Sequence, residues 1–169
     1  MAWTTPQNFT TGQLVDEADM DAISDNLAAL LPVDQVEWDT WTPTLTNFTL
    51  GNGTLVARYT QLAKTVIGQI TFTLGSTSAV GTAGTFSVPV TAGSGYTVAQ
   101  NIIGPCHLFD TSAGTTHSGG VRLESTTTLR PFVNNAAGTF VTVAGLSSTS
   151  PFTWATGDIL QFSFCYEAA

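Results

Sequence analysis

Near the start of the chain, apolar side chains recur at the spacing of an α-helix. The intervals are three, four and three residues, which places four side chains on one stripe of the helix surface. These residues are Met20, Ile23, Leu27 and Leu30. A stripe of about one and a half heptads does not hold a coiled coil together by itself. The helix therefore needs a partner: the rest of the chain, the same helix in other copies, or a groove on a larger particle.

Polar residues at both ends of this segment indicate where the helix begins and ends. Asp16 is a favourable N-cap residue, and Asp19 stands at the third helical position, as in a capping box whose usual residue there is Glu or Gln. Pro32 cannot continue a helix. The sequence therefore predicts one helix over residues 16–31.

After residue 40 the period of the apolar positions falls from about 3.6 residues to 2, the period of a strand with one inward and one outward side. Ten candidate strands follow, with no helix between them: residues 44–50, 54–62, 65–74, 84–90, 96–103, 105–110, 119–124, 128–133, 139–144 and 158–167. Parallel strands need crossover segments that are missing here. The sequence predicts a mainly β protein, with an antiparallel β-sandwich or jelly-roll-like body after a short N-terminal α-helix. Gly51, Asn52 and Gly53 predict a hairpin between the first two strands.

The composition supports this interpretation. Charged residues make up only 9% of the chain, against about 25% in a typical soluble domain, and 30 residues are threonine. Threonine is β-branched and suits a half-exposed strand. We therefore expect a surface covered largely by hydroxyl groups and glycine.

The net charge of −8 lies entirely at one end of the chain. The first 40 residues hold eight acids and no base, while the remainder holds four acids and four bases. The acids of the helical segment are Asp16, Glu17, Asp19, Asp21 and Asp25. We divide the chain into an acidic helical leader for attachment or docking, residues 1–40, and a β-sandwich body, residues 41–169. The acids either form an interaction arm or simply keep a protein of low charge in solution.

Several classes of protein are disfavoured by the same residues. Nucleic-acid binding needs a basic patch, and none is visible. No run approaches the roughly 18 apolar residues that cross a bilayer, so membrane insertion is not expected. Cys106 and Cys165 form no disulfide framework or zinc pattern, and we expect each to be a small buried apolar residue.

A set of short segments is distinctive as a group. In the first half of the body they are residues 41–45 (WTPTL), 47–54 (NFTLGNGT), 57–60 (ARYT), 64–66 (KTV) and 74–77 (LGST). Later in the body they are residues 86–89 (FSVP), 157–158 (GD), Leu160 and residues 166–168 (YEA). In the leader they are Pro6, residues 9–12 (FTTG) and residues 18–27 (ADMDAISDNL).

These segments resemble minor virion structural proteins of tailed bacteriophages, of the type carried by phages of actinobacteria. The leader departs from that pattern where Met20 and Asp21 stand in place of a frequent Leu-Asn pair. The resemblance implies a virion protein with a short helical leader and a β-sandwich body, commonly trimeric.

Few residues are candidates for catalysis. His107 follows Cys106 directly, and adjacent strand residues point to opposite faces, which disfavours a Cys-His dyad. His117 is expected in a flexible loop, and His107, Asp110 and His117 lack the spacing of a metal site. No two carboxylates of the body stand out as a glycosidase pair. We expect neither enzymatic activity nor a cofactor or metal ion.

Tryptophans are the remaining candidates for binding. Trp38 and Trp41 flank the junction of leader and body, and Trp154 lies in a loop or short edge strand. Each is a candidate for subunit contact or for stacking on a sugar ring, and internal packing is the more ordinary role.

Taken with the resemblance, these features lead us to expect an accessory capsid-surface protein of the decoration or head-fibre type. It would be made in the cytoplasm of the host bacterium, form a homotrimer, and attach to the virion surface through its leader. Its partners would be further copies of itself and the major capsid or tail protein. The alternative is a minor tail or tail-fibre protein whose β-sandwich binds host-surface carbohydrate.

Overall fold

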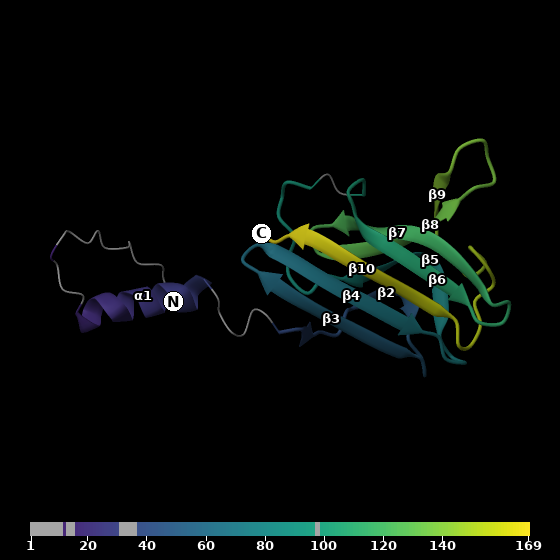
Figure 1. Ribbon diagram of the computed structural model, residues 1–169. Coiled ribbons are helices and arrows are strands. Elements are labelled where there is room, and N and C mark those ends of the chain that lie inside the picture. The colour runs from purple at the N-terminus through teal and green to yellow at the C-terminus, as the bar shows by residue number, and fades with distance from the viewer. Residues whose placement is uncertain (1–11, 13–15, 31–36, 97–98) are drawn as a thin grey trace. The chain divides into compact units, whose positions relative to one another are not determined.

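The computed structural model describes residues 12, 16–30, 37–96 and 99–169, with the side chains of residues 27–30 outside that description. The chain divides into two compact units, Met1–Glu37 and Trp38–Ala169. The first unit contains α1 (Glu17–Leu30), which confirms the predicted helix to within one residue at each end. The second contains the ten described strands and is the body of the protein (Figure 1).

The strands of the body cover most of its length. Their bounds are β1 (Asp39–Thr40), β2 (Leu45–Thr49), β3 (Thr54–Leu62), β4 (Thr65–Thr73), β5 (Ala79–Ser87), β6 (Ile102–Asp110), β7 (Thr115–Ser125), β8 (Thr128–Asn135), β9 (Thr142–Gly145) and β10 (Ile159–Glu167). They form one antiparallel sheet in the order β1-β3-β4-β10-β6-β7-β8-β5-β2, with β9 beside β8. The predicted fold class, mainly β and antiparallel, is confirmed.

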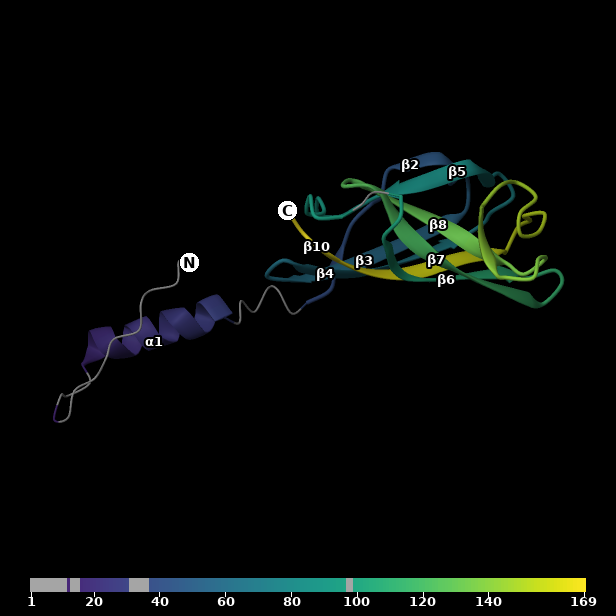
Figure 2. The same cartoon turned by 90° about the horizontal axis from the view of Figure 1, so that it is seen from above.

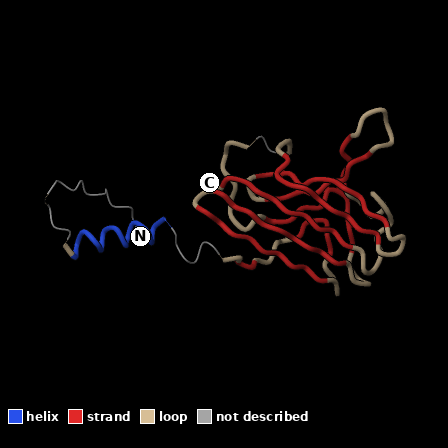
Figure 3. The backbone as a smooth tube through the Cα atoms, in the orientation of Figure 1, coloured by secondary structure: helices blue, strands red, loops and turns tan. Residues whose placement is uncertain are grey.

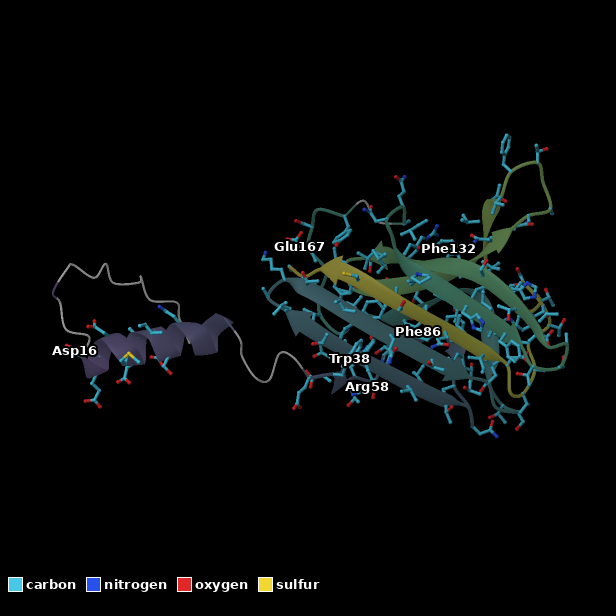
Figure 4. The ribbon with its side chains drawn as sticks, in the orientation of Figure 1. Asp16, Trp38, Arg58, Phe86, Phe132 and Glu167 are labelled. Carbon is cyan, nitrogen blue, oxygen red and sulfur yellow. The ribbon has the colours of Figure 1, made fainter. Side chains whose placement is uncertain are left out.

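The sheet curls until its two ends face each other, which makes the body sandwich-like. Figure 2 shows β2 and β5 in one layer, opposite β3, β4 and β10. Aromatic rings close the space between the layers: the ring centroids of Phe48 and Phe72 are 6.2 Å apart, and those of Phe86 and Phe162 are 5.3 Å apart. Phe86 is fully buried in this interior (Figure 4). The core therefore forms between residues that are far apart in the sequence.

The predicted hairpin at Gly51 and Gly53 is wrong, although a turn is present. Gly53 N–H donates to the Leu50 carbonyl at 2.9 Å, but β2 pairs with β5, whereas β3 pairs with β4 and β1. Gly51 adopts a φ of 54°, so the chain turns a corner there and passes from one layer to the other. Asn52 connects this corner to a second turn, since its Oδ1 accepts hydrogen bonds from the backbone N–H and the hydroxyl of Thr77, both at 3.0 Å.

Two predicted strands, residues 96–103 and 105–110, differ from what the structure shows. Residues 102–110 form the single strand β6, with a register shift between Ile102 and Gly104. A Cβ at position 104 would collide with the backbone carbonyl of Ser163 on the neighbouring β10. Gly104 therefore permits close approach of two strands instead of ending one.

The body begins earlier than the predicted boundary after residue 40. Asp39 and Thr40 form β1, opposite Tyr59 and Arg58 of β3. The Trp38 carbonyl also accepts a hydrogen bond from Arg58 Nη2 at 3.4 Å. Residues 38–40 therefore belong to the body, because their polar backbone groups are paired there.

Candidate attachment helix and outer surfaces of the body

The start of α1 is stabilised by two acids that cap each other. Asp19 N–H donates to Asp16 Oδ1 at 3.0 Å, and Asp16 N–H donates to Asp19 Oδ2 at 3.2 Å. This reciprocal arrangement is a capping box in which a shorter Asp replaces Glu, as the sequence predicts. Asp16 is labelled at the beginning of the helix in Figure 4. Negative charge in the first turn also interacts favourably with the helix dipole.

The surface of α1 presents apolar and acidic side chains together. Met20 and Ile23 are 57% and 50% exposed, so the described half of the predicted stripe is open to solvent. The side chains of Leu27 and Leu30 lie outside the described part of the chain. The acids Asp16, Glu17, Asp21 and Asp25 are exposed, whereas Asp19 is 6% exposed. The helix can therefore offer an apolar contact flanked by negative charge.

Two of the three candidate tryptophans have packing roles. Trp41 packs edge-on against Tyr59 and Phe164, with ring centroids 5.6 and 5.9 Å away. Trp154 Nε1 donates to the Ser147 carbonyl at 3.0 Å, which ties down the loop before β10. Trp38 is 40% exposed.

Candidate catalytic groups are not brought together. Cys106 is buried while the adjacent His107 is exposed, as alternation on a strand requires. Burial raises the pKa of the Cys106 thiol to about 12, so the reactive thiolate is scarce at neutral pH. The predicted loop around His117 is wrong: His117 lies on β7 and packs against Phe152, with ring centroids 5.3 Å apart.

Two carboxylates hold loops of the body in place. Asp110 Oδ1 accepts hydrogen bonds from Ala113 N–H at 2.9 Å and from the Ser112 hydroxyl at 2.7 Å, and these bonds lower the pKa of the Asp110 carboxyl. Asp158 is fully buried, and its two oxygens accept hydrogen bonds from Thr111 N–H at 2.9 Å and Ala155 N–H at 2.7 Å. Within the described residues, no three His, Cys, Asp or Glu side chains are placed to hold a metal ion.

The expectation that both cysteines are buried is wrong for Cys165. This residue is exposed on β10, between the buried Phe164 and Tyr166. It belongs to a surface that we call the outer sheet face. On three strands the face consists of every second residue, starting with the first residue of the strand: Thr54 to Leu62 in β3, Thr65 to Thr73 in β4 and Ile159 to Glu167 in β10. Pro105 and His107 of β6 complete it.

A hollow of about 280 Å³ lies in the outer sheet face, across β4, β10 and β6. The polar side chains that line this central hollow are Gln69, His107, Gln161 and Ser163. Among the described residues, none of these four side chains makes a hydrogen bond. They are therefore free to pair with a ligand or a partner.

A larger hollow, of about 600 Å³, lies near the end of β10. Lys64 and Glu167 line it with opposite charges, and the Tyr96 hydroxyl there accepts a hydrogen bond from Glu167 N–H at 2.5 Å. This hollow therefore presents one positive and one negative charge, which suits a polar ligand. A glycosidase site would need two carboxylates instead.

The connection between β8 and β9, which extends away from the body in Figure 3, was not among the contact surfaces predicted from the sequence. Phe140, Val141 and Val143 are 80%, 66% and 55% exposed there. The sequence feature that could have indicated this exposed apolar segment is the complete absence of charged residues from 131 to 157. This apolar hairpin is a second candidate contact surface.

Comparison with protein families, curated proteins and solved structures finds no match. The described part of the chain also has no helix long and apolar enough to span a membrane.

Proposed function

We propose that this protein is an accessory structural protein of a bacteriophage virion, carried on the capsid surface as a homotrimer. The leader attaches it to the particle, and the β-sandwich body forms the part that projects. The major capsid protein is the proposed docking partner.

The observation that carries this proposal is the contrast between the surface of α1 and that of the body. The capped helix exposes Met20 and Ile23 beside the acids of the leader. An apolar stripe exposed on a short helix gains stability when it is buried against a partner. Because the leader and the body both resemble segments of phage virion proteins, we propose the virion as that partner.

Removal of residues 1–37 tests the attachment. We expect the truncated protein to retain a folded body and to lose its incorporation into virions of the phage that encodes it. The measurement is quantitative detection of the protein in purified particles, with circular dichroism as the control for folding. Normal incorporation of the truncated protein would refute the proposed role of the leader.

Substitutions within α1 can separate the two parts of the proposed contact. The pair Met20→Ser and Ile23→Ser removes apolar surface, whereas the pair Asp21→Asn and Asp25→Asn removes charge. If charge dominates, attachment weakens with added salt, because exposed charges are screened beyond about 8 Å at physiological ionic strength. If the apolar stripe dominates, attachment is insensitive to salt and is lost in the serine variant.

A second candidate function is a minor tail or tail-fibre protein that binds host-surface carbohydrate. The central hollow favours it, because its free amide, imidazole and hydroxyl groups are the kind of uncharged donors and acceptors that pair with sugar hydroxyls. Binding of a neutral glycan that is lost in Gln161→Ala would support this function over capsid decoration.

A further inference from the structure

We propose that the outer sheet face is the surface through which copies of this chain contact one another. The inference rests on the self-assembly included in the proposed function, and it assigns that assembly to a particular face of the body.

Few charged residues stand on this face. Arg122, Glu124 and Arg130 form an ion-pair cluster on β7 and β8, with N–O distances of 3.1 and 2.9 Å. Asp158 is buried and Asp110 holds a turn. The outer sheet face carries only Arg58 and Glu167, which have opposite signs. A second copy can therefore approach it without meeting an excess of like charge.

Exposed apolar side chains stand on the same face. Val56, Leu62 and Ile67 are 56%, 57% and 43% exposed. The register places Ile67 directly opposite the exposed Cys165 of β10 and diagonally from Leu62 of β3, so the apolar positions continue across three strands. A surface with few charges and exposed aliphatic groups resembles the central part of a protein interface.

The size of the face suits a subunit contact. Strands β3, β4 and β10 each have nine residues, which span about 30 Å, and four neighbouring strands spaced about 4.8 Å apart are about 19 Å wide. The projected area is therefore at most roughly 570 Å², because β6 contributes only Pro105 and His107 to the face, and the relief of the side chains increases the accessible area above the projected one. Stable interfaces bury roughly 600–1,000 Å² on each partner.

The central hollow favours a second copy as the occupant. Amide side chains carry both donors and acceptors, so an amide on one copy can pair with an amide on another. Gln69 and Gln161 have no hydrogen-bonding partner among the described residues, and Ser163 lies beside them. In a ring of three copies the same face turns toward the threefold axis on every copy, so amide groups close to the axis can pair with those of the neighbouring copies.

The test uses the full chain and begins with the wild-type protein. We expect sedimentation to give three times the 17.7 kDa mass of one chain. In that assembly a thiol reagent should fail to label Cys165, although Cys165 is exposed in the single chain. The buried Cys106 should remain unlabelled throughout. Labelling of Cys165 in an assembled protein, at the rate measured in unfolded protein, would overturn the proposal without any substitution.

The matched variants are Ile67→Glu on β4 and Val143→Glu on β9. Each adds one negative charge at an exposed apolar position: the Ile67 side chain is 43% exposed and the Val143 side chain 55%. We expect Ile67→Glu to lower the mass threefold and to make Cys165 reactive, and Val143→Glu to change neither. Loss of the trimer in Val143→Glu but not in Ile67→Glu would place the contact at the β8–β9 hairpin and overturn the proposal. Ser163→Glu serves as a second variant if Ile67→Glu does not fold.

Two further results distinguish this inference from the proposed function. A wild-type chain that is monomeric yet incorporated into virions through its leader would overturn the outer-face contact and leave attachment standing. A monomeric wild-type chain that binds a neutral glycan, with binding lost in Gln161→Ala, would assign the central hollow to a ligand and likewise overturn the contact.

Discussion

The leader and the body are stabilised by interactions of very different range. In α1 the capping hydrogen bonds join residues three apart in the sequence. In the body, the Tyr166 hydroxyl donates to the Val90 carbonyl, 76 residues away, and the rings of Phe86 and Phe162 meet across the sandwich. The helix can therefore form and adapt locally, whereas the body depends on contacts that form together.

The same contrast separates their surfaces. The helix combines exposed acids with exposed apolar residues, while the body has few charges and a buried aromatic core. A segment that folds locally can change its stability without changing the fold of the rest. This independence is what an attachment arm needs, and substitutions in the two regions can test it.

The largest effect is expected in the aromatic core. Phe86→Ala removes a ring that contacts Phe48 and Phe162 and is completely buried. We expect it to lower the free energy of unfolding of the body by about 4 kcal/mol, as measured by denaturant titration. Phe140→Ala, at an 80% exposed site, is the control and should have little effect. A loss below about 1 kcal/mol at position 86 would contradict the central place of these rings.

The next effect is expected at the buried carboxylate before β10. Asp158→Ala leaves the N–H groups of Thr111 and Ala155 without their acceptors. We expect the free energy of unfolding to fall by about 3 kcal/mol, because hydrogen bonds to charged groups are stronger than neutral ones. Asp110→Ala, at an exposed turn, should lower the free energy of unfolding by a smaller amount. Equal losses in the two variants would show that burial of Asp158 does not strengthen its hydrogen bonds.

A pH titration tests burial of one cysteine. Burial raises the pKa of the Cys106 thiol from 9.0 to about 12 in the folded protein. Between these values the unfolded chain releases a proton that the folded chain keeps, so the free energy of unfolding falls as the pH rises. The slope approaches about 1.4 kcal/mol per pH unit. It should diminish in Cys106→Ala and persist in Cys165→Ser, and the same slope in both variants would contradict the assignment.

The smallest effect is expected at the helix cap. Asp16→Ala removes the acceptor for Asp19 N–H and should destabilise α1 by about 1 kcal/mol. The helical circular dichroism signal of the full chain should decrease while the unfolding midpoint of the body stays constant. Asp25→Ala, beyond the first turn, is the matched control for loss of charge. A shift in the body's midpoint would show that the two regions are energetically coupled.

Features that depend only on residues close together in the chain were predictable from the sequence. The helix ends follow from Asp16 and Pro32, and β4 and β10 follow from the alternation of inward-facing apolar residues. The exposed position of Cys165 was also predictable, because the alternating Phe164 and Tyr166 face the core on either side of it. The candidate docking residues of α1 could be proposed for the same reason, since helical spacing alone places Met20 and Ile23 on one side.

Other features were decided by the tertiary structure alone. The sequence indicated a turn at Gly51 and Gly53, but only the pairing of β2 with β5 shows that the chain changes layer there. Likewise, the half-buried Trp41 packs against the core because Tyr59 and Phe164 reach it from distant segments. Local sequence sets the side on which a residue lies, whereas the partner on that side depends on how distant strands align. The outer sheet face and its central hollow exist only after β3, β4, β10 and β6 have come together.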